Sequence, residues 1–377
     1  MLIIGIIVGL IVLVFLVAAH ELGHAIVAKR NGVVVEEFGI GFPPRAWAKK
    51  LKNGVLFTVN WLPLGGFVRL QGESDDASKK GDYGNATFWQ KTKILFAGVA
   101  VNWLIAVVLL TILALTGLPS GIPNQFTVPS DTKTISGPVQ IGAVTAGYPA
   151  EKAGLEKGDK IISLDGQAID TSAKLIEVSK ANRGETVKVV YERDAQQTTA
   201  DVALRDADSA TFGAALGQSQ KTKSTWSAPI VGVVSTGQYT WLTLQGLGNL
   251  VSNFFGGLAG QLSPSEEGRE KATNQLNEAG ASVAGPLGIL GVIFPAASEV
   301  GLTQVVFLAA IISLTLAVMN TLPIPSLDGG RWFVTALFRV LKKPLTKDIE
   351  ERINGTGFMV LLGLILLVTI ADVLKLF

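Results

Sequence analysis

The sequence predicts a polytopic α-helical membrane protein that carries a folded domain between its membrane spans. The 377-residue chain is 48% hydrophobic and only 16% charged, so it holds more apolar sequence than a compact soluble core would bury. The apolar residues are concentrated in four long runs, each near the length needed to cross a bilayer. The middle of the chain instead shows short alternating segments and glycine turns, which are typical of a small globular domain.

The four predicted transmembrane helices cover residues 1–30, 94–118, 302–322 and 356–377. About 20 apolar residues cross the roughly 30 Å of bilayer hydrocarbon, because a helix rises about 1.5 Å per residue. The first run is also compatible with a signal peptide, but no Lys or Arg precedes it and it passes directly into a polar motif. We therefore expect a first helix that is retained.

Basic residues are concentrated in two of the segments that connect these spans. Residues 31–93 follow the first span and residues 331–355 follow the third, and both segments are rich in Lys and Arg. The positive-inside rule places both of them in the cytoplasm. Both chain termini and the long stretch 119–300 are then expected on the other side of the membrane.

Two further apolar segments within residues 226–300 are not expected to span the membrane. In 226–262 the apolar residues recur at helical spacing and polar residues fill the other face, which favours an amphipathic helix lying at the membrane interface. The segment 283–297 is short and contains Pro286 and Pro295. It is expected to be re-entrant or packed against other helices.

Two regions are expected to fold outside the spans. Residues 31–93 are interpreted as a membrane-associated β segment on the cytoplasmic side, with alternating residues at 57–61. Residues 128–212 are interpreted as a separate α+β domain on the opposite side. There a strand-like run at 161–164 is followed by Asp165-Gly166, which predicts a tight turn.

The charge and the cysteine content exclude several kinds of site. A net charge of +2 with dispersed Lys and Arg lacks the concentrated positive surface of a nucleic-acid-binding protein. The expected surroundings are therefore the lipid bilayer and not nucleic acid. The chain has no Cys, which excludes disulfides and thiolate metal sites, and it has only two His. Any metal must be bound by histidine and carboxylate.

His20, Glu21 and His24 form a His-Glu-x-x-His pattern at the end of the first apolar run. Histidines four residues apart on a helix lie on one face, as two ligands of one zinc ion require, and Glu21 beside them can take a proton from water. The alternative is that these residues only mark a polar helix end. A zinc site is favoured because ionisable side chains next to a span are costly and usually functional.

The third zinc ligand must be a carboxylate, because a catalytic zinc ion needs three protein ligands and no other His or Cys remains. Asp328 is the candidate. It lies within residues 302–330, just past the third span, on the side where the predicted topology also places the two histidines. Pro323 and Pro325 would break the helix before it. Asp-Gly-Gly after prolines is also an ordinary turn, so the assignment depends on the topology.

These residues resemble the site-2 protease family of intramembrane zinc metalloproteases, in particular the regulator-of-sigma-E-protease-like bacterial type with one PDZ domain. The matching motifs are His-Glu-Leu-Gly-His at 20–24 and Asn-x-x-Pro-x-x-x-Leu-Asp-Gly at 320–329. The resemblance covers essentially the whole chain. It implies that Asn320 holds the substrate backbone, although a buried Asn also bonds between helices. It further implies a Zn²⁺ site with Glu21 as the catalytic base and with three ligands, His20, His24 and Asp328.

Two more segments share in the resemblance and one departs from it. Residues 63–68 include Gly65 and Gly66 and resemble a β segment that pairs with an unwound substrate by strand addition. Residues 147–159 resemble the opening of a PDZ domain, which implies that the domain at 128–212 is an extracytoplasmic PDZ domain. Residues 98–102 lack the proline that commonly follows the glycine in the family. That departure concerns packing and affects no ligand.

The resemblance implies hydrolysis of peptide bonds in or near the spans of single-span membrane proteins, such as anti-sigma factors or signal-peptide remnants, in the bacterial plasma (inner) membrane. The PDZ domain is expected to exclude substrates with bulky outer domains rather than to bind peptides. A non-enzymatic PDZ adaptor is the alternative, but its structural zinc would need four protein ligands and only three are found. A transporter would show repeated halves, and the two pairs of spans share no motif.

Overall fold

The structure of the chain is a computed structural model that describes residues 2–207 and 209–376. It divides into two compact units. The first, here called the membrane unit, comprises Met1–Leu113 and Pro229–Phe377. The second, here called the inserted unit, comprises Ala114–Ala228. We describe each unit by itself.

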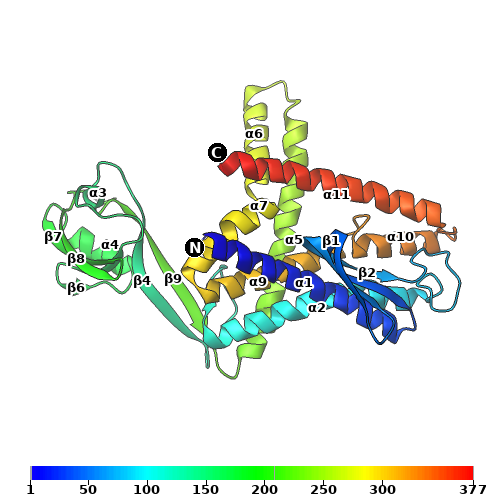
Figure 1. Cartoon of the computed structure of the whole chain (residues 1–377). Helices are drawn as coiled ribbons and strands as arrows, with labels where there is room; N and C mark the ends of the chain where they lie inside the picture. The colour runs from blue at the N-terminus through cyan, green and yellow to red at the C-terminus, as the bar shows by residue number, and fades with distance from the viewer. Residues whose placement is uncertain (1, 208, 377) are drawn as a thin grey trace. The chain divides into compact units, whose positions relative to one another are not determined.

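Four helices of the membrane unit are long and apolar enough to cross a membrane (Figure 1). They are α1 (Leu2–Arg30), α2 (Phe88–Thr116), α9 (Leu302–Thr321) and α11 (Lys347–Leu376). The predicted set of four candidate spans is thereby confirmed by length and composition. Within the described residues the number rises to five if α6 (Glu266–Ala281) and the helical segment after it, which meet at a bend of 54°, form one broken span.

Helix α2 begins at Phe88 rather than at residue 94, because a capping box precedes it. The backbone N–H of Thr87 donates to Oε1 of Gln90 at 2.8 Å, and the backbone N–H of Gln90 donates to Oγ1 of Thr87 at 3.3 Å. These two bonds satisfy amide groups that have no partner within the first helical turn. The Thr-x-x-Gln signal was present in the sequence, and it lies upstream of the apolar run.

The segment after α1, interpreted from the sequence as a β segment, forms two long antiparallel strands, β1 (Val35–Lys50) and β2 (Leu56–Leu70). Their register shifts repeatedly, which indicates β-bulges that bend the pair. The buried carboxylate of Glu37 holds the two strands together, since it accepts from Oγ1 of Thr58 at 2.9 Å and pairs with Arg45 at 3.0 Å. β2 packs against α1.

The rest of the membrane unit is helical. α5 (Ala228–Gly260) is a continuous helix that does not qualify as a candidate span within the described residues; its location at the interface stays a prediction. The re-entrant segment of the sequence analysis is divided into short pieces, α7 (Pro286–Gly288), the π-helical turn η1 (Ile289–Ile293) and α8 (Phe294–Val300). After α9 comes α10 (Asp328–Val340).

The inserted unit consists of an antiparallel sheet and two helices. The spatial order of the strands is β3-β9-β4-β5-β7-β8, with β6 paired to β5. The elements are β3 (Leu118–Pro119), β4 (Lys133–Val144), α3 (Pro149–Lys152), β5 (Lys160–Leu164), β6 (Gln167–Ala168), α4 (Ser172–Ala181), β7 (Thr186–Arg193), β8 (Gln196–Ala203) and β9 (Ala214–Lys223). The sequence analysis ended this domain at residue 212 and so omitted β9, which pairs with β4 along the whole of its length.

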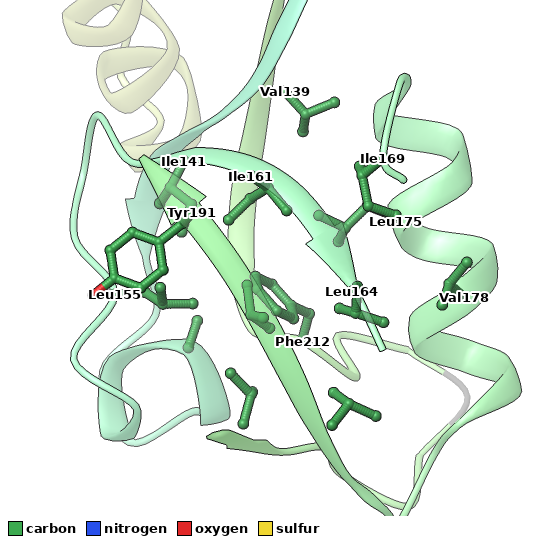
Figure 2. Close-up of a cluster of buried hydrophobic side chains, with 14 of the residues drawn as sticks. Val139, Ile141, Leu155, Ile161, Leu164, Ile169, Leu175, Val178, Tyr191 and Phe212 are labelled. Carbon is green, nitrogen blue, oxygen red and sulfur yellow. The ribbon is translucent and has the colours of Figure 1, made fainter. Parts of the chain in front are cut away.

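The inserted unit has a hydrophobic core of its own. Figure 2 shows side chains of the strands, among them Ile161 and Leu164, facing Leu175 and Val178 of α4. Leu164 and Leu175 are fully buried. Between β5 and β6 the predicted turn is present, and both Asp165 (φ 49°) and Gly166 (φ 74°) have the positive φ that a type I′ turn requires.

Candidate metal centre

Helix α1 brings the two histidines of the chain together at a buried position. His20 and His24 are 7% and 6% exposed, and their Nε2 atoms are 3.1 Å apart. They lie one turn apart, so both rings project from the same face of α1. Two nitrogen lone pairs at this distance repel each other, and a cation between them would remove the repulsion.

Asp328 completes the group from the other end of the chain. Its Oδ2 atom is 3.1 Å from Nε2 of His20, a residue 308 positions away, and 3.3 Å from Nε2 of His24. Burial alone would raise the pKa of Asp328, but the two adjacent imidazoles hold this pKa below its usual range. The side chain therefore remains a carboxylate at neutral pH, which is the form that binds metal.

The three donor atoms have the spacing of a zinc site. Ligands about 2.0–2.1 Å from zinc at tetrahedral angles are about 3.3 Å apart, and the observed separations are 3.1, 3.1 and 3.3 Å. Two imidazole nitrogens and a carboxylate oxygen are also donors that zinc accepts. Among the described residues, no fourth His, Cys, Asp or Glu belongs to this group. The residues present fit a zinc ion with one open position.

A tightly packed loop presents Asp328. Helix α9 ends at Thr321, and α10 begins at Asp328 itself. A Cβ atom on Gly330 would lie 1.8 Å from the carbonyl oxygen of Ile324, so only glycine allows the start of α10 to approach the loop this closely. The Asp-Gly-Gly sequence forms the first turn of α10 rather than a separate loop turn, and Asp328 lies at the start of that helix.

Glu21 lies beside the three ligands without joining them. It is close enough to His20, His24 and Asp328 to interact electrostatically with each. Strand β2 passes next to it, since a Cβ on Gly66 would lie 3.5 Å from Cγ of Glu21. Glu21 is half-buried, at the edge of the group where a base must lie to reach a water molecule.

The remaining predicted residues fall at different distances from this centre. Gly66 lies next to Glu21 and so close to the centre. Gly65 has a φ of 83° and packs against Phe42 of β1 instead. Asn320 uses its amide within its own helix, where Nδ2 donates to the carbonyl oxygen of Leu316 at 3.0 Å. The structure thus brings together the four residues around the metal position, whereas the hydrogen bond of Asn320 stays within its own helix.

The sequence analysis missed the contribution of α2. The Nδ1 atom of His24 is 2.7 Å from the carbonyl oxygen of Ile94, so this nitrogen carries a proton and donates. Nε2 is then the nitrogen with the free lone pair. Near it, Gly98 leaves open the space for a metal, since a Cβ there would lie 2.5 Å from Nε2 of His24 and 2.7 Å from Nε2 of His20. A glycine within an apolar span was the available signal.

Comparison with known proteins agrees with this geometry. The sequence matches peptidase family M50 over residues 8–364. The zinc metalloprotease RasP of Geobacillus kaustophilus is 27% identical over 96% of each chain, and the regulator of sigma-W protease RasP of Bacillus subtilis is 25% identical over 96% of each chain. A Clostridium perfringens relative is 29% identical over 95% of each chain.

A PDZ domain of an SdrC-like protein from Listeria monocytogenes matches 21% of this chain and 86% of that chain, at 29% identity. Its TM-score of 0.19 is too low for a comparison of folds. The family match and the names of the relatives confirm the prediction of a zinc-dependent protease. The chain belongs to peptidase family M50, the site-2 proteases.

Proposed function

We propose that this protein cleaves peptide bonds in or near the membrane spans of single-span membrane proteins, with anti-sigma factors and signal-peptide remnants as the candidate substrate classes. The observation that carries the proposal is the position of the three zinc-spaced donor atoms. His20 and His24 belong to a candidate span, and Asp328 follows directly after another. A substrate within the bilayer can reach this centre without leaving the membrane.

Zinc held by His20, His24 and Asp328 would act as a Lewis acid that polarises the scissile carbonyl and acidifies water. Glu21 accepts the proton of the attacking water and then delivers it to the leaving amine. The half-buried position of Glu21 between the ligands and β2 supports both roles. Three protein ligands also favour catalysis over a structural metal in an adaptor, because structural zinc sites use four.

A helical substrate must unwind before cleavage, because its carbonyl groups are engaged in helical hydrogen bonds. Strand β2 next to Glu21 provides extended backbone near the reaction centre. We propose that the segment around Gly65 and Gly66 pairs with the unwound substrate, which is then added as a further strand. Asn320 is our candidate for a further contact to the substrate backbone, which requires that its amide leave the carbonyl oxygen of Leu316.

The positive-inside rule supports a centre on the cytoplasmic side, with the inserted unit on the opposite side. We propose that the inserted unit is a PDZ domain that excludes substrates with bulky outer domains. The structure adds a feature that the sequence analysis did not anticipate. A cavity of about 440 Å³ lies between α4 and the start of β9, with Ile176 and Leu216 in its lining. Such a groove is large enough for a few peptide side chains, so the filter role needs a direct test.

The Glu21→Gln variant tests the proposed reaction. The amide keeps the shape of the side chain but cannot accept a proton, so we expect cleavage of a single-span reporter to fall at least about 100-fold. Zinc content should stay at the wild-type level. Glu299→Gln, at an exposed position of α8, serves as the control. Near-normal cleavage by Glu21→Gln at full zinc occupancy would exclude Glu21 as the base.

A further inference from the structure

One face of α2 lines both histidines of the metal centre. Ile94, Gly98 and Asn102 are spaced by four residues, so they lie on one side of this helix. Ile94 contacts His24, Gly98 borders both rings, and Asn102 contacts His20. This face of α2 therefore runs alongside both histidines. It contacts the Nδ1 atom of each ring, and Gly98 leaves an open space between the two contacts.

The two histidines differ in what fixes their protonation. His24 donates from Nδ1 to a main-chain carbonyl, which can only accept, so its Nε2 is free to bind metal. For His20 the corresponding partner is the side-chain amide of Asn102, with Nδ2 at 3.4 Å from Nδ1. An amide has one end that donates and one that accepts. It follows that the orientation of this amide and the tautomer of His20 are coupled.

The surroundings of Asn102 show which orientation suits the metal. Asn102 is fully buried, and its Oδ1 has no hydrogen-bond partner among the described residues. If the amide nitrogen donates to Nδ1 of His20, the proton of the imidazole resides on Nε2, where it blocks metal binding. A half-turn of the amide presents Oδ1 to Nδ1–H instead. That arrangement gives the buried oxygen a donor and leaves the lone pair of Nε2 for the metal.

The main chain at Asn102 is itself held in place. The buried hydroxyl of Ser313 of α9 donates from Oγ to the carbonyl oxygen of Asn102 at 2.8 Å. The bond links α9 to α2 at the level of His20. Because the backbone is fixed, rotation of the amide is the simplest change that can switch its partner atom. The alternative is a purely structural role, in which Asn102 only holds α2 and α9 together.

We propose that Asn102 is a positioning residue that holds His20 in the tautomer with a proton on Nδ1 and so prepares Nε2 to bind zinc. The inference rests on the proposed zinc site. It adds a residue that contacts neither metal nor substrate and acts only through His20. Its effect should therefore appear in the state of one imidazole and in zinc affinity, whether or not a substrate is present.

The chain permits a direct test because it holds only two histidines. Solid-state NMR of full-length protein labelled with ¹⁵N-histidine, in lipid and loaded with zinc, would report two imidazoles. We expect both to carry the proton on Nδ1 and to bind zinc through Nε2. Binding of zinc through Nδ1 of His20 would overturn the inference in the wild-type protein, without any variant.

Three variants complete the test, with zinc affinity measured by competition against a chelator. We expect Asn102→Leu to lower zinc affinity about 10- to 100-fold and to leave His20 in mixed tautomers. Asn102→Asp keeps an acceptor and should restore a single tautomer and most of the affinity. Asn249→Leu, exposed on α5, should change neither. Wild-type affinity and an unchanged His20 spectrum in Asn102→Leu would refute the role of Asn102. Absence of zinc from the wild-type protein would instead refute the proposed function.

Discussion

Each unit of the protein has an aspartate with close side-chain partners, and the kind of partner differs. In the inserted unit, Asp159 is 1% exposed and accepts from Nε of Arg193 at 2.7 Å. A guanidinium is always charged, so this carboxylate has a permanent counter-ion. In the membrane unit, Oδ2 of Asp328 lies 3.1 and 3.3 Å from the Nε2 atoms of His20 and His24. These rings must be neutral to bind a metal, and the metal then supplies the balancing charge.

This difference separates a structural carboxylate from a functional one. The Asp159 pair is complete within the chain, so its loss should affect only the folding of the inserted unit. The Asp328 group has the spacing of a metal site, so its loss should affect metal binding and activity. Substitutions that act on one group at a time test this distinction.

The largest effect is expected for Asp328→Ala. Loss of one of three ligands should weaken zinc binding by more than the roughly 100-fold seen for indirect contacts, and cleavage should be lost with the metal. Asp348→Ala removes an exposed carboxylate from the first turn of α11 and is the matched control. Metal analysis should find zinc in the control only. Tight zinc binding by Asp328→Ala would remove Asp328 from the ligand set.

Gly98→Ala should produce the next largest loss of zinc binding, because the added methyl group would occupy the space beside the two histidines. Alanine ordinarily stabilises a helix by about 1 kcal/mol relative to glycine, but here its Cβ would approach both Nε2 atoms. We expect weaker zinc binding in a helix that is otherwise intact. Gly246→Ala on α5, where a Cβ would meet nothing within 4 Å, supplies the comparison. Equal zinc affinities in the two variants would show that α2 shifts enough at this position to accommodate the methyl group.

Asp159→Asn should affect the inserted unit and spare the metal. Burial alone would raise the pKa of Asp159, but Arg193 and the N–H of Glu156 hold it below its usual range. A lowered pKa contributes stability above the unfolded value of about 3.9, and this stability is lost as the pH falls through the folded pKa.

We therefore expect amides of β5 and β7 to exchange hydrogen about 10- to 100-fold faster in this variant at pH 7. The difference from wild type should shrink below about pH 4, and zinc content should not change. Loss of zinc from Asp159→Asn would show that the Asp159 pair also affects the metal site and is not purely structural.

The smallest effect is expected from blocking the groove of the inserted unit. Ile176 is 48% exposed and lines the cavity next to α4, so Ile176→Arg should fill the groove without disturbing the core. If the unit only excludes bulky substrates, cleavage of a reporter with a short outer segment should be unchanged. A marked loss of cleavage would indicate that the groove binds peptides.

Removal of the inserted unit gives the complementary result. A deletion variant that keeps its zinc should accept reporters with large folded outer domains that the full chain rejects. Continued rejection of these reporters would contradict the filter. A similar loss of cleavage for every reporter would indicate activation, at most the roughly 1–3 kcal/mol typical of coupling between sites.

The sequence predicted the parts of this structure that depend on local pattern. Apolar run length predicted the candidate spans, and the four-residue spacing of His20 and His24 predicted a shared face. Elimination predicted a carboxylate ligand, and the structure places Asp328 within 3.3 Å of both histidines. Each of these arguments needs only the order of residues and the chemistry of their side chains.

The parts that were missed depend on which segments pack together. The carbonyl oxygen of Ile94 leaves no trace in the sequence, because every residue has one. Gly98 became informative only once α2 was seen beside α1. Strand β9 is polar and contains Gly217, so its strand character comes from pairing with a distant strand rather than from its own residues.

The wide separation of the ligands along the chain sets the order in which the enzyme is assembled. His20 and His24 are made early, whereas Asp328 is reached only near the end of synthesis. A nascent chain that stops before Asp328 has two of the three ligands, and two do not make a catalytic zinc site. If these three residues hold the zinc ion, a chain still being synthesised would lack protease activity until Asp328 and the helices around it are in place.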